Sequence, residues 1–436
     1  MKLLRGGAEW LVRLEIILLA LVYASFVATD AVPLWAFAII ALVWFARWQL
    51  TGRATYTTPL DLPILLLVIW LPVSFSVSIA PWASLPKIVG VVLSVLFYYA
   101  VVNALATPRD LAWAVLWLVM VCAGIALAGL VGTDWAQGKI ISVSSIYDHL
   151  PRFIQGIPRS IAGGFARNGV GGTLTLTIPL LAALAVTKNS LDAAGRWQTQ
   201  KGIFRRALAF VRAQSKWIAL ASLVLSLLTL ALTQSRGGIL GTAIGLVALA
   251  IWRERRFAWL LVVGALGLVV ALMLGYGAAL LDFVLRMDAQ SGTLASRLEV
   301  WQRGLMMMQD FSITGIGIGT YNSIAHLLYP FFIASPAEVV AHAHNQFLQV
   351  AVDLGIPGLI AYIALLTGGV LVARRAYRST GDMTVRALLV GLTCGLFAHH
   401  VFGLTDAFIL GTKPGVVMWI YFALVAAMDR MSSGVA

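Results

Sequence analysis

Long apolar runs recur along the whole 436-residue sequence, and they constrain the fold more than any other feature. A helix needs about 20 apolar residues to cross the hydrocarbon core of a bilayer. Only 11% of the residues are charged, whereas soluble domains carry about 25%. The sequence therefore predicts an all-α integral membrane protein, a single polytopic domain over residues 1–436 with about twelve transmembrane helices. The predicted spans are 10–29, 33–46, 60–79, 86–105, 111–131, 169–187, 217–233, 238–252, 257–281, 346–373, 387–407 and 415–429.

The basic residues divide unequally between the two sides of this predicted bundle. Cytoplasmic loops of membrane proteins collect lysine and arginine. With the N-terminus inside, 20 of the 31 basic residues fall on the cytoplasmic side and 10 on the outer side. We therefore expect both termini to be cytoplasmic and the loops 132–168 and 282–345 to lie outside. No small-residue cleavage site follows the first apolar run, so we expect that run to be retained as a span.

Basic residues in the cytoplasmic loops, and basic residues that bind an anionic substrate, are the expected causes of the net charge of +13. No module of basic and aromatic residues typical of nucleic-acid binding is visible, so nucleic acid is not an expected partner. The outer basic residues are different, because the topology does not require them. Each of them is therefore a candidate for function.

Arg236 stands at a tight turn between two predicted spans and is followed by Gly237 and Gly238. Glycines permit a sharp turn and leave backbone N–H groups open to an anion. The guanidinium fork matches the geometry of a phosphate. The sequence thus makes Arg236 a candidate phosphate ligand, although interfacial turn arginines without such a role are common.

A helix predicted within the long outer loop carries Arg297 and Arg303. Arg297 lies at the edge of an apolar stripe, so we expect it to reach inward, and Arg303 lies opposite, so we expect it to point to water. A snorkelling position at the membrane surface is the alternative for Arg297. The residues of the stripe are Leu294, Leu298, Trp301, Leu305 and Met308.

Two glycine-rich segments accompany these arginines. Arg159 and Arg167 flank one of them and are candidate substrate contacts, and Arg152 lies in the same loop. The other, "GIGIGTYN" at 315–322, lacks the spacing and the strand–helix context of a dinucleotide site. We expect a close-packed glycine turn there.

The polar group His342, His344, Asn345 and Gln346 stands where a long span begins. A neutral imidazole near pH 7 is an effective general base, which makes His344 the candidate catalytic residue. His342, Asn345 and Gln346 are candidate substrate contacts or orienting groups. Asp353 falls on the opposite face of the predicted helix, so we do not expect it to partner His344.

A metal site would need further ligands beside the two histidines. Asp310 and Glu338 lie in the same loop, but neither a D-x-D nor an H-E-x-x-H motif accompanies them. The sequence therefore predicts no metal and no cofactor.

Five motifs in this order resemble the O-antigen ligase and polymerase superfamily, over roughly residues 155–375. The resemblance implies a membrane glycosyltransferase (GT-C-like) bundle in the bacterial inner membrane, with a lateral opening and a periplasmic loop as its lid. It also implies no metal and no nucleotide. The motifs are "RSIAGGFARN" (159–168), "TQSRGGILG" (233–241), "SRLEVWQRGL" (296–305), "GIGIGTYN" (315–322) and "AHAHNQFLQVAVDLGIPGL" (341–359).

The ligase branch of this superfamily transfers a polysaccharide from undecaprenyl pyrophosphate to the lipid A-core oligosaccharide. By resemblance, Arg236 and Arg297 would hold the pyrophosphate and His344 would activate the acceptor hydroxyl. An O-antigen polymerase or a protein O-oligosaccharyltransferase would share the donor chemistry and differ in the acceptor. A transporter for the lipid-linked sugar is a further alternative. A transporter should show broken helices or charged residues at mid-membrane, and mid-span charges are sparse in this sequence, whose polar residues cluster at one face.

Overall fold

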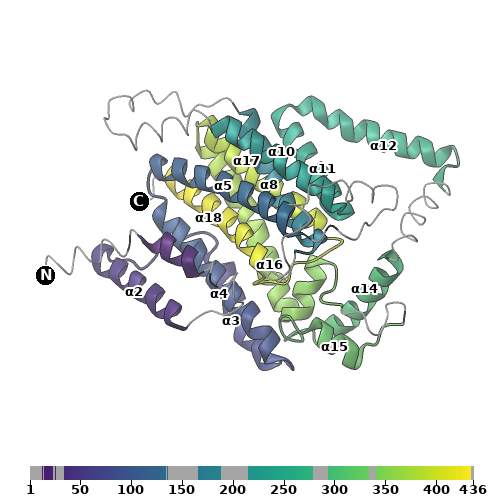
Figure 1. Cartoon of the computed structure of the whole chain (residues 1–436), viewed down its shortest axis with the longest axis horizontal. Coiled ribbons are helices and arrows are strands. Elements are labelled where there is room, and N and C mark those ends of the chain that lie inside the picture. Colours follow the sequence, from purple (N-terminus) through teal and green to yellow (C-terminus); the bar gives the residue numbers. More distant parts are fainter. Residues whose placement is uncertain are drawn as a thin grey trace.

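The computed structural model describes residues 34–133, 135, 165–187, 215–277, 293–332 and 340–433, together with parts of 12–25. Over these residues the chain is helical, and its only β contact is an isolated bridge between Thr133 and Phe165. Most of the long helices lie side by side in one bundle (Figure 1). The helices are α2 Leu34–Thr51, α3 Asp61–Ser76, α4 Pro81–Ala104, α5 Pro108–Gly132, α8 Arg167–Val186, α10 Ser215–Thr233, α11 Arg236–Arg253, η4 Arg255–Phe257, α12 Ala258–Met273, α14 Thr293–Asp310, α15 Tyr321–Leu328, α16 Gln346–Ser379, α17 Met383–Phe402, η5 Lys413–Gly415 and α18 Val416–Ser433.

Nine of the described helices are long and apolar enough to cross a membrane, and two shorter apolar helices precede them. The protein is therefore a multi-pass helical membrane protein, and eleven of the predicted spans correspond to helices. The first predicted span, 10–29, is described only in part. Among the others, the span predicted at 387–407 is wrong at its end, because α17 stops at Phe402 and Gly403 caps it by donating to the carbonyl of His399.

Helix α8 lies at the centre of the bundle and packs against α5, α10, α11 and α17. Close approach is possible because small residues stand at the contacts. A Cβ added to Gly171 would lie 2.7 Å from the Cβ of Ser235, and one added to Gly172 would lie 2.3 Å from the ring of Phe402. The starts of α8 and α11 are thereby held against the end of α17.

The described part of the long loop forms α14 and α15, which lie together beside the start of α16 (Figure 1). The buried face of α14 contains Val300, Gly304 and Met307 rather than the predicted stripe. Leu298 and Leu305, which the stripe included, are exposed. The helix phase predicted from the sequence was therefore wrong, because this helix has a second set of apolar residues that packs inward.

Arg303 corrects a second expectation, since it does not point to water. Its side chain is only 16% exposed. The guanidinium lies 3.8 Å from the carboxylate of Glu299 and stacks over the ring of Phe332. Arg303 therefore has a structural role in joining α14 to the segment that follows α15.

The glycine turn predicted at 315–322 is confirmed. Gly315, Gly317 and Gly319 all have positive φ, and side chains there would collide with α16, with Ser78 and with α4. The turn rests on a kink in α16 at Gly355, whose φ is 68°. Two backbone bonds join the segments, from the N–H of Ile316 to the carbonyl of Val352 (2.9 Å) and from the N–H of Ile356 to that of Ser312 (2.7 Å).

Candidate functional site

The polar group at 342–346 forms the entrance to α16. Asn345 is the N-cap residue, and its side-chain oxygen accepts hydrogen bonds from the backbone N–H groups of Phe347 (3.1 Å) and Leu348 (3.0 Å). Asparagine is among the preferred residues for this position, because it satisfies donors that have no partner within the helix. The cap fixes where the helix begins, and so fixes the position of His344 immediately before it.

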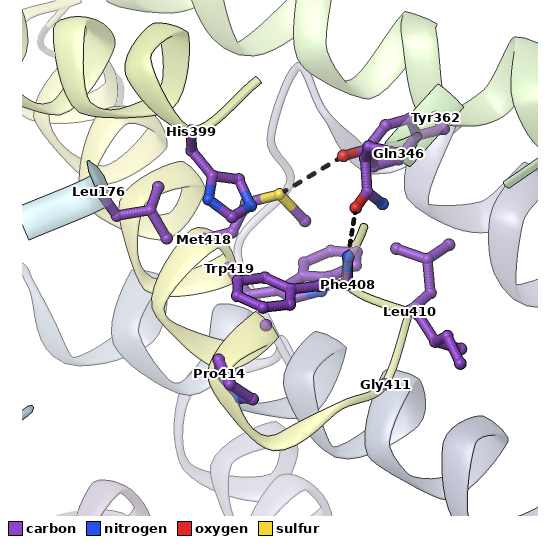
Figure 2. Close-up of a pocket in the computed structure, with 12 residues that line it drawn as sticks. Leu176, Gln346, Tyr362, His399, Phe408, Leu410, Gly411, Pro414, Met418 and Trp419 are labelled. Atoms are coloured by element: carbon purple, nitrogen blue, oxygen red, sulfur yellow. Dashed lines mark hydrogen bonds between the residues drawn. The ribbon is translucent and has the colours of Figure 1, made fainter. Parts of the chain in front are cut away.

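Asn345 and Gln346 also hold the loop that follows α17. The Asn345 side chain donates to the carbonyl of Leu404 (3.2 Å). Gln346 uses its backbone N–H to reach the carbonyl of Gly403 (2.6 Å), and its side-chain oxygen accepts from the N–H of Phe408 (2.8 Å; Figure 2). These two residues were predicted to orient the imidazole or a substrate hydroxyl. In the structure their hydrogen bonds position the segment 403–408, and contact with a substrate stays a prediction.

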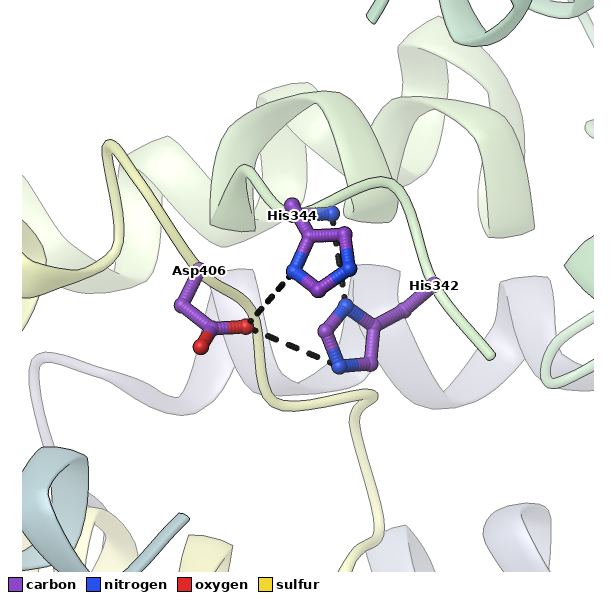
Figure 3. Close-up of side chains that lie close together, drawn as sticks. All are labelled: His342, His344 and Asp406. Carbon is purple, nitrogen blue, oxygen red and sulfur yellow. Dashed lines mark hydrogen bonds and ion pairs between the residues drawn. The ribbon is translucent and has the colours of Figure 1, made fainter. Parts of the chain in front are cut away.

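This segment brings Asp406 against the two histidines (Figure 3). Nδ1 of His344 lies 3.1 Å from Oδ1 of Asp406, and Nε2 of His342 lies 3.6 Å from the same oxygen. A carboxylate accepts, so Nδ1 of His344 carries the hydrogen. The other nitrogen, Nε2, is then the basic one. An imidazole held in one tautomer by a buried carboxylate is the arrangement of a general base with its orienting group.

The charges in this cluster support the same assignment. Burial raises the pKa of Asp406, but the hydrogen bond from His344 and the nearby imidazoles outweigh it and hold that pKa below its ordinary value. Burial lowers the pKa of His342 to about 4; the Asp406 charge opposes this, and the charges of His344 and Arg297 add to it. At neutral pH, Asp406 is therefore ionised and His342 is neutral.

The backbone of His344 is strained. Its φ is +48°, a left-handed conformation that is uncommon for residues other than glycine, although asparagine, aspartate and histidine adopt it more often than the rest. Among the described non-glycine residues, only Gln234 shares a positive φ, also +48°, and it stands two positions before Arg236. Strain of this kind clusters at functional sites, where surrounding contacts maintain it. Both strained residues occur in segments that the sequence had singled out.

Arg297 approaches the cluster from α14. Trp301, one turn further along that helix, donates its indole N–H to the carbonyl of His344 (3.1 Å). Residues four apart share a helix face, and the charge of Arg297 acts on His342. The structure therefore places Arg297 on the side of α14 that faces the histidines.

Arg236 approaches from α11, of which it is the first residue. The next residue, Gly237, packs so closely that an added Cβ would lie 2.6 Å from Oγ1 of Thr405. Thr405 adjoins Asp406, so the exposed start of α11 lies beside the loop that carries the carboxylate. Arg236 at the start of α11, Arg297 on α14 and His344 just before α16 thus lie at the same end of the bundle.

The remaining arginine candidates are not placed beside the histidines by any contact that the structure describes. Arg167 is the first residue of α8 and is buried, with its guanidinium 5.9 Å from the ring of Trp135. Such a position favours a packing role over direct contact with a substrate. Arg152 and Arg159 lie outside the described residues.

His342, His344 and Asp406 also form a group that could hold a metal ion, since their ligand atoms lie within 4.8 Å of one another. Two imidazoles and a carboxylate are a suitable donor set for several transition metals. The nearby positive charge of Arg297 opposes a second cation there. Of the two carboxylates noted in the sequence of this loop, Asp310 accepts a hydrogen bond from Tyr329, and Glu338 lies outside the described residues. Absence of a metal remains a prediction.

A small cavity lies behind the Gln346–Phe408 hydrogen bond and is also lined by Tyr362, His399 and Trp419 (Figure 2). Its volume is about 20 Å³, which suffices for a single water molecule but not for a sugar. The cavity therefore belongs to the packing beneath the 403–408 segment. We do not assign substrate binding to it.

Asp406 is the site residue that the sequence did not reveal. It stands 62 positions after His344 in the chain. The predicted span 387–407 included it, although an acidic residue near the end of an apolar run is itself a signal that the span has ended. Recognition of that signal would have placed Asp406 on the same side of the membrane as His344.

Residues 221–363 match a family model described as O-antigen ligase. The predicted resemblance is thereby confirmed over these residues, which include Arg236, Arg297, His342, His344 and Gln346. Arg167 and Asp406 lie outside the matched range. No curated protein sequence gives a significant match.

Proposed function

We propose, from the match to the O-antigen ligase family, that this protein transfers O-antigen polysaccharide from undecaprenyl pyrophosphate to the lipid A-core oligosaccharide. The observation that carries the proposal is the His344–Asp406 pair, a base with its orienting carboxylate, at the end of the bundle where Arg236 and Arg297 also lie. The basic-residue distribution supports a periplasmic location for this end, with both termini in the cytoplasm of a bacterial inner-membrane protein.

In the proposed reaction, Nε2 of His344 accepts the proton of the acceptor hydroxyl. The acceptor oxygen forms a bond to the anomeric carbon, and the bond between that carbon and the pyrophosphate oxygen breaks. The electron pair remains on the pyrophosphate, where the guanidinium groups of Arg236 and Arg297 stabilise the added charge. Asp406 stabilises the imidazolium that results.

A single displacement of this kind inverts the anomeric centre. Retention by double displacement would require a carboxylate nucleophile that reaches the sugar. Asp406 is a poor candidate for that role, because its side chain is 7% exposed and its Oδ1 already accepts from His344 and from the N–H of Ala407. The expected stereochemical outcome is therefore inversion.

The test is reconstitution of the purified protein with undecaprenyl-pyrophosphate glycan and three separate acceptors. Transfer to lipid A-core is the expected result. Elongation of the lipid-linked glycan alone would identify a polymerase, and transfer to protein would identify an O-oligosaccharyltransferase. Movement of the donor across the bilayer without transfer would refute the enzyme assignment.

The same assay tests whether a metal takes part. We expect full activity in the presence of a chelator, because arginines supply the positive charge at the leaving group. Activity that is lost in chelator and restored by one divalent ion would instead assign His342, His344 and Asp406 to a metal site.

The proposed orientation has its own test. Single cysteines are introduced in place of Lys201 and of Gln290, and a membrane-impermeant thiol reagent is added to intact cells. The position 290 should be modified and the position 201 protected. The reverse pattern would overturn the topology.

A further inference from the structure

A second cavity lies at the opposite end of the bundle from His344. The first turns of helix α18 line the same small cavity as Phe408, and Arg430 lies in the last turn of that helix. At about 1.5 Å per residue, Arg430 is roughly 20 Å from the start of that helix. Its guanidinium carbon lies 3.7 Å from the ring centroid of Tyr56, which lines the cavity. The cavity is therefore separate from the proposed transfer site.

The volume of this second cavity is about 200 Å³, several times the volume that a single water molecule requires. None of the described residues that line it is acidic, and two of them are arginines. A cavity with two cations and no carboxylate in its wall favours an anion. The lining residues are Arg47, Thr51, Arg53, Thr55 and Tyr56.

Arg47 is the most informative of these residues, because it is only 8% exposed. One of its terminal nitrogens pairs with Glu15. Its Nε is also buried and makes no hydrogen bond within the part of the chain that the structure describes. Buried donors in folded proteins almost always have a partner, so this nitrogen calls for an acceptor that the described residues do not supply.

The wall of the cavity is held in place by its own hydrogen bonds. The Thr51 hydroxyl donates to the carbonyl of Arg47 (2.8 Å) and accepts from the N–H of Arg53 (3.4 Å). The N–H of Tyr56 donates to the side chain of Asn103 in α4 (3.1 Å). Helix α2 presents Arg47 near its C-terminal end, and the turn that follows the helix presents Arg53 and is anchored to α4 through Tyr56.

The surface of α2 places the cavity at the level of the lipid headgroups. Leu42, Phe45 and Trp48 are spaced three residues apart and are all more than half exposed, as expected for a face in contact with acyl chains. This face ends at Trp48, which lies between Arg47 and Thr51, two residues that line the cavity. Tryptophan is enriched where the hydrocarbon core meets the headgroups.

We propose that this cavity binds the phosphate group of an anionic phospholipid headgroup, with Arg47 and Arg53 as the donors. Arginine matches phosphate by paired N–H···O bonds, and basic pockets between transmembrane helices suit such headgroups. A free phosphate ion carries the same chemistry, and the position of the cavity beside a lipid-facing helix favours the lipid. The proposal is independent of the transfer reaction at the other end of the bundle.

The test uses the full chain purified in a neutral detergent, with thermal unfolding followed by tryptophan fluorescence. Phosphatidylglycerol, phosphatidylcholine or inorganic phosphate is titrated at constant ionic strength. Phosphatidylglycerol should raise Tm saturably, by about 3 °C at a large excess over Kd. Arg53→Gln should shift the midpoint of that titration to about tenfold higher lipid, since one charged hydrogen-bond donor is lost.

The matched control is Arg374→Gln, which removes one exposed arginine from the end of α16 on the same side of the bundle. It should leave the midpoint unchanged. Equal shifts in the two variants would mean diffuse attraction to surface charge and would overturn the proposal. Equal stabilisation by inorganic phosphate, abolished in Arg53→Gln, would overturn the lipid assignment. Because Arg53 is exposed, this variant tests the site without disturbing the buried Arg47–Glu15 pair.

Discussion

Asp406 and Asp429 are two buried carboxylates at opposite ends of the bundle, and their partners differ. Their side chains are 7% and 5% exposed. Asp429 pairs with both nitrogens of an arginine fork, with Nε of Arg375 at 2.7 Å from its Oδ1. Asp406 meets two imidazoles and no arginine among the described residues that contact it.

The difference teaches what makes a buried acid functional. A guanidinium keeps its charge at every physiological pH and all its nitrogens are donors, so the Asp429 pair can only hold two helices together. An imidazole bound through one nitrogen keeps a second nitrogen that can accept and release a proton. Equal burial therefore permits a structural role at one end and a chemical role at the other.

The largest expected effect is that of His344→Gln. Glutamine can still donate a hydrogen bond to Asp406, but it cannot accept a proton, so turnover should fall by about 10²- to 10⁴-fold. Binding of the lipid-linked donor should persist, because the arginines remain. Both quantities are measured in the reconstituted system. Near-normal turnover of the glutamine variant would show that His344 is only structural.

Arg236→Ala and Arg297→Ala should each reduce turnover by about a hundredfold, if each supplies one preorganised charge to the leaving group. Lysine should restore only part of the loss, because it lacks the fork. Arg303→Ala is the control within α14. It should lower Tm, because the buried carboxylate of Glu299 loses the nearby guanidinium. Turnover per folded molecule should stay near normal. Similar turnover losses at 297 and 303 would contradict the assigned roles.

Asp406→Asn and Asp429→Asn test the two carboxylates directly. Loss of the charged hydrogen bond should cost about 1.5–3 kcal/mol in each case. For Asp406→Asn we expect the lost free energy to raise the activation barrier, so that turnover falls roughly ten- to hundredfold. For Asp429→Asn we expect the loss in the free energy of unfolding, with turnover per folded molecule unchanged. A lower turnover in Asp429→Asn, or an unchanged turnover in Asp406→Asn, would contradict the assignment of a structural role to Asp429 and a chemical role to Asp406.

The smallest effect is expected from His342→Gln, which should leave most of the turnover intact. The folded-state pKa of His342 is about 4, below the ordinary value near 6.5. Between these values the unfolded chain binds a proton that the folded chain does not, so wild-type stability falls as the pH is lowered from 6.5 to 4. The variant should show a shallower fall in Tm over that window. His326→Gln, which removes an exposed histidine of α15, should retain the wild-type slope.

The predictable parts of the molecule were those governed by local pattern. Apolar run length located eleven helices, and glycine spacing located the turn at 315–319. The phase of α14 was not predictable in this way. A helix that touches both the bundle and lipid has two apolar faces. The exposed Leu298 and the buried Val300 are equally apolar, so hydrophobic periodicity does not tell which face packs inward.

The partner of His344 depended on packing rather than pattern. Asp406 reaches the imidazole because the side chains of Asn345 and Gln346 and the backbone N–H of Gln346 hold the segment 403–408 that follows α17. Sequence spacing does not encode these hydrogen bonds. The kink at Gly355 was missed for a similar reason. The contacts that stabilise it come from Ser312 and Ile316, in a segment of the chain that follows α14.

The left-handed backbone of His344 has a consequence for how this protein would respond to selection. Replacement by glycine would relieve about 1–2 kcal/mol of conformational strain. A library screened only for heat tolerance would therefore enrich variants that have discarded the imidazole, and the most thermostable clones would be inactive. In a lineage that no longer needs the transfer reaction, position 344 should be among the first to drift.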